Sequence, residues 1–153
     1  MDNEMLMELI RRYEQAHFVV EKRLHVLFKE IMPEELTVDQ FVTLRFIRNR
    51  GRVTSSELAE NFFVGRSSIT AIINRMVDKR LIERHPDQSD RRVIYLSLTE
   101  SGENLAAQLE IKMRDLLAKY LQQFQADEAS SFIHTYEKLA KVLMQEPGRV
   151  GEE

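Results

Sequence analysis

Apolar residues recur every three or four positions along most of the chain, which is the spacing of amphipathic helices. Residues 5–31 follow this pattern without a break, and Pro33 then stops the helix that they predict. Two further long helices are predicted over residues 100–123 and 127–144, the second with Asp127 as its N-cap. The predicted fold class is therefore mainly α.

Three shorter helices are predicted in the middle of the chain. Capping boxes open the first of them at Thr37 and the second at Thr54. Gly51 is placed to be the C-cap of the first. The third follows a turn at Gly65 and runs to about Arg80.

The hydrophobic period changes from about 3.6 to 2 after the third short helix. Residues 92–98 alternate between apolar and polar side chains, and residues 81–85 can pair with them across the polar loop 86–91. The sequence thus predicts a small β-hairpin, a wing, directly after a helix-turn-helix.

The two helices between Thr54 and Arg80 have the composition of a DNA-reading unit, although any packed pair of amphipathic helices would share its apolar pattern. Five large apolar residues are expected to pack them together: Leu58, Phe62, Val64, Ile69 and Ile72. The second helix then turns Ser, Thr and Arg side chains outwards, which suits a helix entering the DNA major groove. The candidate DNA contacts are Arg66, Ser67, Ser68, Thr70, Asn74 and Arg75, together with Thr54 and Ser55.

The wing loop carries Asp90, Arg91 and Arg92, which complete the candidate DNA contacts. In an arbitrary protein such a tip is an ordinary solvated loop. Behind a helix-turn-helix, however, it lies against the adjacent minor groove, whose negative potential attracts a guanidinium. Asp90 is expected to hold an arginine or to cap loop amides, because a carboxylate does not favour a phosphate.

The charge distribution agrees with DNA binding better than the net charge of −3 does. Residues 37–99 hold 11 Lys/Arg against 7 Asp/Glu, a net charge of +4, whereas residues 1–36 and 100–153 carry −3 and −4. A basic centre between acidic ends is typical of a DNA-facing module on an acidic scaffold.

The absence of three sequence features narrows the expected location of the protein in the cell. There is no cysteine, so disulfides, thiolate zinc sites and cysteine redox sensing are excluded. No apolar run reaches the ~20 residues that span a bilayer, and the N-terminus lacks the order of a secretory signal. We therefore expect a cytoplasmic protein with no membrane partner.

The stretch from Leu36 to Gly102 resembles the MarR family of multiple antibiotic resistance regulators. The most specific similarity is the run Asp90–Thr99, which resembles the family's D-x-R wing and L-x-L-T strand, followed by Glu100-Ser101-Gly102 at the start of the next helix. The resemblance implies that Arg92 is a minor-groove arginine with Asp90 as its partner. It also implies recognition-helix contacts by Ser68, Thr70, Asn74 and Arg75.

We expect a single domain over residues 1–153. A winged helix-turn-helix over 37–99 would join a helical dimerisation region formed by 5–31 and 100–145, and residues 146–153 are predicted to be a disordered tail. Left exposed, the apolar stripes of the terminal helices would form an unusually large patch. They could pack on one another within one chain, but the resemblance implies that the first and last helices of two chains intertwine.

The predicted function is sequence-specific regulation of transcription by a homodimer on a (pseudo)palindromic double-stranded DNA operator, with half-sites about one helical turn apart. Repression by promoter occlusion is expected. The resemblance further implies release by a small aromatic or amphipathic effector. Residues that could line an effector cleft are Tyr13, His17, Phe41, Arg45 and Phe46, although ordinary core packing explains the aromatic ones equally well. The alternative function is a protein-interaction module whose basic face meets an acidic partner protein.

No catalytic residues, cofactor or metal are predicted. Gly65-Arg66-Ser67 lacks the spacing of a phosphate-binding loop, and neither Ser67 nor Ser68 has a base visible in the sequence. His17 and His25 share a helix face with Glu21, but two turns separate them by about 12 Å of helical rise, too far for one ion.

Overall fold

The computed structural model describes residues 2–145, which divide into two compact units between Val38 and Asp39. The tail predicted over 146–153 lies outside the described residues. Within residues 2–145, none of the helices combines the length and apolarity needed to cross a membrane.

The first unit is built on one helix, α1 (Asn3–Ile31), which begins two residues earlier than the periodicity predicts. Asp2 explains the earlier start, because its carboxylate accepts a hydrogen bond from the amide of Met5 at 2.8 Å and so caps the helix. Met32 takes an extended conformation at the other end, as residues before proline do. No residue of α1 is buried.

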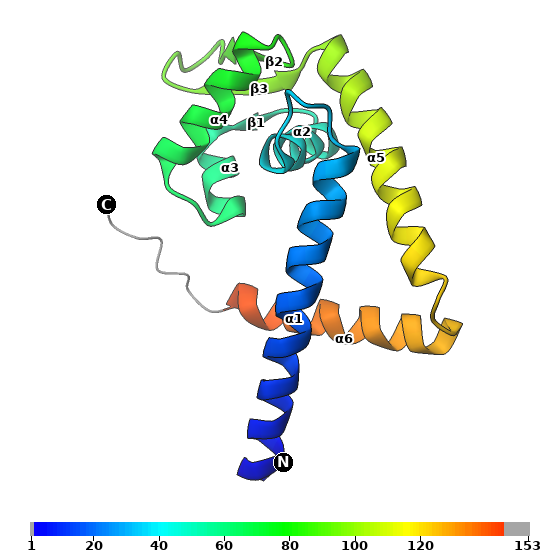
Figure 1. Cartoon of the computed structure of the whole chain (residues 1–153). Helices are drawn as coiled ribbons and strands as arrows, with labels where there is room; N and C mark the ends of the chain where they lie inside the picture. The colour runs from blue at the N-terminus through cyan, green and yellow to red at the C-terminus, as the bar shows by residue number, and fades with distance from the viewer. Residues whose placement is uncertain (1, 146–153) are drawn as a thin grey trace. The chain divides into compact units, whose positions relative to one another are not determined.

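The second unit contains the short helices, the wing and the two C-terminal helices (Figure 1). In chain order its elements are α2 (Val38–Arg50), β1 (Val53–Thr54), α3 (Ser55–Phe62), α4 (Arg66–Asp78), β2 (Ile82–Pro86), β3 (Ile94–Leu98), α5 (Glu100–Leu121) and α6 (Ala126–Gln145). The prediction of a mainly α fold with a β-hairpin wing is confirmed. Asp127 is the second residue of α6, so its assignment as the N-cap is wrong by two residues, and Gln125 directly precedes the helix.

The wing is the larger part of a three-stranded antiparallel sheet with the order β1-β3-β2. The predicted hairpin is present, with Ile82 opposite Leu98 and Pro86 opposite Ile94. Strand β1 is not apparent from the sequence, since two residues are too short to show a period. It pairs with β3 through Val53, which is buried opposite Leu96.

The core of the second unit is formed by one face of each short helix together with β3 and the start of α5. The largest fully buried side chains include Phe41, Leu44, Ile47, Leu58, Ile69, Ile73, Met76, Leu96 and Leu109. Of the five predicted packing residues, Leu58 and Ile69 are buried. The other three, Phe62, Val64 and Ile72, are half-buried. In α4 the fully buried neighbour is Ile73, which was not among the five. From Ile69 the buried face continues at i+4 and i+7, which leaves the i+3 position at its edge.

The first turn of α5 rests directly on the backbone at the base of the wing. The Thr99 hydroxyl accepts a hydrogen bond from the amide of Gly102 at 3.0 Å and donates one to the carbonyl of Arg80 at 2.7 Å. The amide of Thr99 donates to the carbonyl of Leu81 at 3.1 Å. A Cβ atom on Gly102 would lie 2.1 Å from that same Leu81 oxygen, so only glycine fits here.

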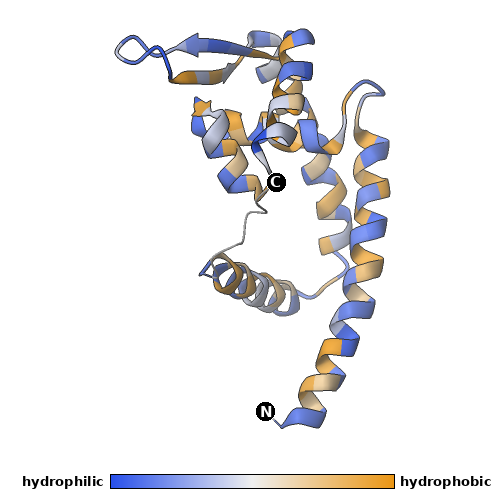
Figure 2. Cartoon of the chain, turned by 90° about the vertical axis from the view of Figure 1, so that its left-hand side faces the viewer, coloured by the Kyte–Doolittle hydropathy of each residue, from blue (hydrophilic) through white to orange (hydrophobic). Residues whose placement is uncertain are grey.

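The apolar stripe of α6 is exposed. Hydrophobic residues occur along the whole helix (Figure 2), yet none of its residues is buried, and Phe132 is 57% exposed. The N-terminal part of α5 behaves differently, because Ala106, Leu109 and Met113 are buried within the chain. Their burial does not test the alternative left open by the sequence, in which the terminal helices pack on one another within one chain.

The turn between α3 and α4 contains a strained residue. Phe63 has φ 53° and ψ 38°, the left-handed conformation that costs a residue with a Cβ roughly 1–2 kcal/mol. We expect Phe63→Gly to be more stable than Phe63→Ala by about 1 kcal/mol, since both remove the ring but only glycine adopts this conformation freely. Urea denaturation of the two variants measures the difference. Equal stability, or a more stable alanine variant, would contradict the strain.

Candidate nucleic-acid interface

The outward face of α4 carries the predicted base-reading residues. Ile69, Ile73 and Met76 face the core, so helix geometry places Ser67, Ala71 and Asn74 on the opposite face. All the α4 residues singled out in the sequence are exposed: Arg66, Ser67, Ser68, Thr70, Asn74 and Arg75. Ala71 was missed, although a small apolar side chain on this face suits contact with a thymine methyl group.

The N-terminus of α4 is left open. Gly65 is the N-cap residue and provides no side-chain hydrogen bond. The amides of the first helical turn therefore point outwards without a side-chain acceptor, next to the cationic side chain of Arg66. In this arrangement the amides of a helix N-terminus donate hydrogen bonds to a phosphate oxygen.

The polar side chains of α4 differ in whether they form hydrogen bonds within the protein. Thr70 donates its hydroxyl hydrogen to the carbonyl of Arg66 at 2.8 Å, which leaves its oxygen and its methyl group for a ligand. Among residues 2–145, no side chain forms a hydrogen bond or ion pair with those of Ser67, Ser68 or Arg75.

Asn74 is tied to the adjacent strand. Arg84 of β2 donates from Nη2 to the Asn74 side-chain oxygen at 2.5 Å. Arg84 is not apparent as a site residue from the sequence, because the first strand of the hairpin is recognisable there only as a pairing partner. The short connection between α4 and β2 was the available signal, since it returns the strand alongside the helix.

Thr54 and Ser55 lie at the start of α3, as predicted, but only one of their two hydroxyl groups is available to a ligand. The Thr54 hydroxyl accepts the amide hydrogen of Glu57 at 3.2 Å, and Glu57 in turn accepts from the amide of Thr54 at 2.6 Å. This capping box confirms the predicted helix start and occupies the Thr54 side chain. Ser55 is exposed and has an uncommitted hydroxyl within the described part of the chain.

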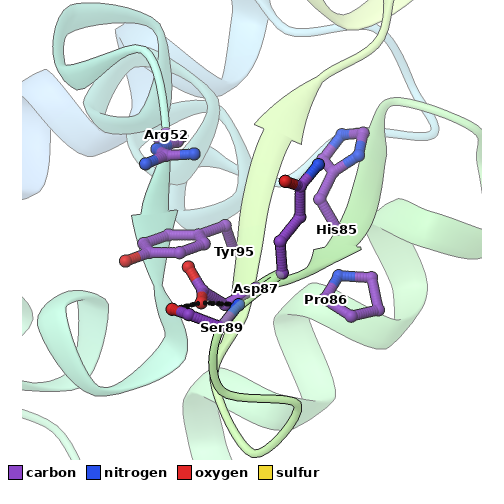
Figure 3. A pocket seen from close by; sticks show the side chains of 7 residues that line it. Arg52, His85, Pro86, Asp87, Ser89 and Tyr95 are labelled. Carbon is purple, nitrogen blue, oxygen red and sulfur yellow. Dashed lines mark hydrogen bonds between the residues drawn. The ribbon is translucent and has the colours of Figure 1, made fainter.

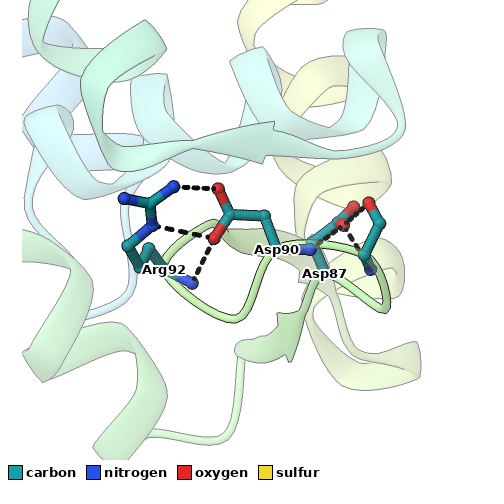
Figure 4. Close-up of polar contacts among 4 residues, drawn as sticks. Asp87, Asp90 and Arg92 are labelled. Atoms are coloured by element: carbon teal, nitrogen blue, oxygen red, sulfur yellow. Dashed lines mark hydrogen bonds and ion pairs between the residues drawn. The ribbon is translucent and has the colours of Figure 1, made fainter.

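The wing loop holds Arg92 in one orientation (Figure 4). Asp90 accepts from Arg92 Nε and Nη2, each at 3.0 Å, and also from the Arg92 amide at 3.0 Å. The expectation that Asp90 holds an arginine is confirmed. The Arg92 side chain nevertheless remains 90% exposed, so the pair presents an oriented cation to solvent.

A second carboxylate, missed in the sequence, shapes the same loop. Asp87 accepts from the amides of Ser89 and Asp90 at 2.8 and 2.9 Å and from the Ser89 hydroxyl at 2.5 Å. The Ser89 hydrogen bond is the main reason why the pKa of Asp87 lies below its ordinary value. The Arg92 guanidinium does the same for the pKa of Asp90.

We expect the wing loop to be insensitive to pH between about 8 and 5. Because hydrogen bonding lowers the pKa of Asp90, its contribution to loop order is complete above the ordinary carboxyl value of about 3.9 and is lost only as pH falls through the lowered value. An NMR pH titration of the Arg92 Nε–H signal measures this, with Asp90→Asn as the control. A transition above pH 5 that is absent from the control would contradict it.

The outer face of the sheet contains a polar hollow of about 660 Å³ (Figure 3). The Arg52 Cζ atom lies 4.3 Å from the centroid of the Tyr95 ring. The rest of the hollow is lined by His85, Pro86, Asp87, Gln88 and Ser89. The His85 Nε2 atom lies 2.8 Å from the Ser97 hydroxyl and 3.2 Å from a Glu83 oxygen. Both contacts use one ring nitrogen, so this group does not have the base-and-orienter geometry of a catalytic triad.

The assignment of one residue to a possible effector cleft, Phe41, is wrong. Phe41 is fully buried, so it belongs to the core and cannot line an open cleft. Arg45 lines a smaller hollow of about 260 Å³ on α2 and α5, and its Nε atom lies 3.9 Å from Glu110. Phe46 makes an edge-to-face contact with Phe62 at 5.4 Å between ring centroids.

Comparisons with known proteins agree with this geometry. A family model described as MarR family matches residues 35–93. The HTH-type transcriptional repressor MdtR of Bacillus subtilis (strain 168) is 32% identical over 130 residues, which cover 80% of this chain and 84% of MdtR.

Solved structures share the fold. A mutant MarR from Escherichia coli complexed with operator DNA is 27% identical with a TM-score of 0.73, and the match covers 86% of this chain and 95% of that one. A MarR family protein from Bacillus stearothermophilus, 24% identical, has a TM-score of 0.77 and matches 95% of this chain and 99% of its own. The chain belongs to the MarR family of DNA-binding, winged-helix transcriptional regulators.

Proposed function

We propose that this protein is a homodimeric cytoplasmic repressor that recognises a (pseudo)palindromic operator in double-stranded DNA and is released by a small aromatic or amphipathic effector. The observation that carries the DNA-binding part is the pairing of an exposed, uncapped α4 with an exposed wing arginine in one unit. The first element suits the major groove and the second the adjacent minor groove. Relatives support the assignment, since MdtR is named a repressor and the similar MarR structure contains operator DNA.

The proposed dimerisation region is formed by residues 5–31 and 100–145. Its support is the apolar surface that the terminal helices leave uncovered in a single chain, with no residue of α1 or α6 buried. Exposed patches of this kind mark association sites. A two-fold dimer would cover them and would set two DNA-reading units on successive half-sites.

Selection of bound duplexes from random DNA tests the operator and the dimer together. Enrichment of an inverted repeat, with half-site centres about 10–10.5 bp apart or a multiple of that spacing, is the expected result. Equal affinity for selected and scrambled duplexes would contradict sequence-specific binding and would favour the alternative, a protein-interaction module.

Sedimentation of two α6 variants tests the dimer itself. Phe132→Glu should yield monomers with weakened operator binding, because it buries a charge in the proposed subunit contact. Ser130→Glu adds the same charge to the opposite face of the helix and should remain dimeric. Dimerisation of both variants would exclude α6 from the interface.

A further inference from the structure

The amide of Asn74 has only one orientation available beside Arg84. A guanidinium carries N–H donors and no acceptor, so the amide must turn its oxygen towards Arg84. The 2.5 Å contact between Arg84 Nη2 and Asn74 Oδ1 shows this arrangement. The Nδ2 amino group of Asn74 is then fully available to a ligand, whereas one of the two lone pairs of Oδ1 is taken by Arg84.

Asn74 occupies the centre of the outward face of α4, seven residues after Ser67 and three after Ala71. Both Asn74 and Arg84 are exposed, and they belong to α4 and β2, which pack against each other in the same unit. The Arg84 hydrogen bond therefore orients the amide within this one unit, without DNA.

This pairing disfavours one mode of base recognition. An unrestricted asparagine recognises adenine with two hydrogen bonds, in which its oxygen accepts from N6 and its amino group donates to N7. Arg84 takes one of the two lone pairs of the Asn74 oxygen and places a cation beside the other, which weakens acceptance from the adenine amino group. The Asn74–Arg84 pair therefore presents chiefly donors and a positive charge, and guanine offers two major-groove acceptors, N7 and O6, to such a pair.

We propose that Arg84 is a positioning and specificity-determining residue that makes Asn74 act chiefly as a donor and so favours guanine over adenine at the base pair that Asn74 meets. The inference rests on the proposed function, because it assumes that α4 reads the major groove. Arg84 differs here from Arg92, whose guanidinium is paired with a carboxylate.

Parallel selections from random duplexes with the wild-type protein, Asn74→Ala, Arg84→Ala and the double variant test the proposal. The position that loses its base preference in Asn74→Ala is the one read by this pair, and the wild type should prefer guanine there. Arg84→Ala should shift that preference towards adenine, changing the ratio of guanine to adenine affinities by about tenfold, within the range of one bidentate contact. The double variant should show neither preference.

Two further variants distinguish a positioning role of Arg84 from a general effect of its positive charge. Arg84→Lys keeps a donor within reach of the Asn74 oxygen and should retain the guanine preference. Lys112→Ala removes an exposed cation from α5 and should leave the base preference unchanged. Thermal unfolding checks that each variant is folded.

The outcomes are distinct. If Arg84→Ala weakens all duplexes equally and lowers the salt dependence by about one charge, Arg84 contacts a phosphate and the proposal is overturned. A base preference that Asn74→Ala leaves intact at every position also overturns it. If the wild-type protein selects no sequence, the proposed function itself fails, and this inference fails with it.

Discussion

Replacement of Arg92 by alanine is expected to weaken operator binding by about 1–3 kcal/mol, or roughly 5- to 150-fold. The side chain is 90% exposed and is aligned by Asp90 before DNA arrives, so little conformational freedom is lost when it enters the minor groove. The slope of log affinity against log salt should fall by about one unit. Titration of a fluorescent duplex at several salt concentrations measures both effects.

Two controls sharpen this prediction. Asp90→Asn keeps the shape of the wing loop but loses the carboxylate that grips the guanidinium, so its effect should be smaller than that of Arg92→Ala. Lys112→Ala removes a cation away from the wing and should leave the salt slope unchanged. Binding of Arg92→Ala like the wild type across the salt series would show that the wing does not contact DNA.

Substitution of Gly102 by alanine is expected to destabilise the fold by about 2 kcal/mol or more. The added Cβ would lie 2.1 Å from the carbonyl oxygen of Leu81, which already accepts the amide hydrogen of Thr99. Backbone cannot move aside as a flexible side chain can, so the first turn of α5 must shift from the wing base. This cost exceeds the gain of about 1 kcal/mol in helix propensity from glycine to alanine.

Urea denaturation measures the change, with substitution of the exposed neighbour, Ser101→Ala, as the matched control in the same turn. The control should stay within about 0.5 kcal/mol of the wild type. A Gly102→Ala variant as stable as the wild type would show that α5 is not held against the Leu81 backbone.

Local signals in the sequence were sufficient for most of the fold. The capping box at Thr54 and the C-cap at Gly51, whose φ is +82°, depend on residues within a few positions, and both are present. Strand β1 was not predictable, because its two residues become a strand only through pairing with β3, about forty positions later. The sequence likewise does not show that Ile73 is more deeply buried than Ile72, because this depends on which neighbours cover α4.

The candidate interface was predictable in composition but not in its hydrogen bonds. Exposure of the α4 residues follows from the apolar stripe opposite them. That the Thr54 hydroxyl is used in a cap, and that Asn74 is held by Arg84, depends on rotamers and on the place of the adjacent strand. A list of exposed polar residues therefore overestimates the number of free ligand-binding groups.

The edge strands of the sheet that forms the wing are poorly suited to pairing with a further strand. One border is β1, which is two residues long, and the other is β2, whose last residue, Pro86, has no amide hydrogen to donate. Short or proline-containing outer strands are poor templates for intermolecular strand addition. An arginine-bearing loop can thus project into solvent without making its supporting strands a nucleus for aggregation, even when many copies of the protein crowd together in the absence of DNA.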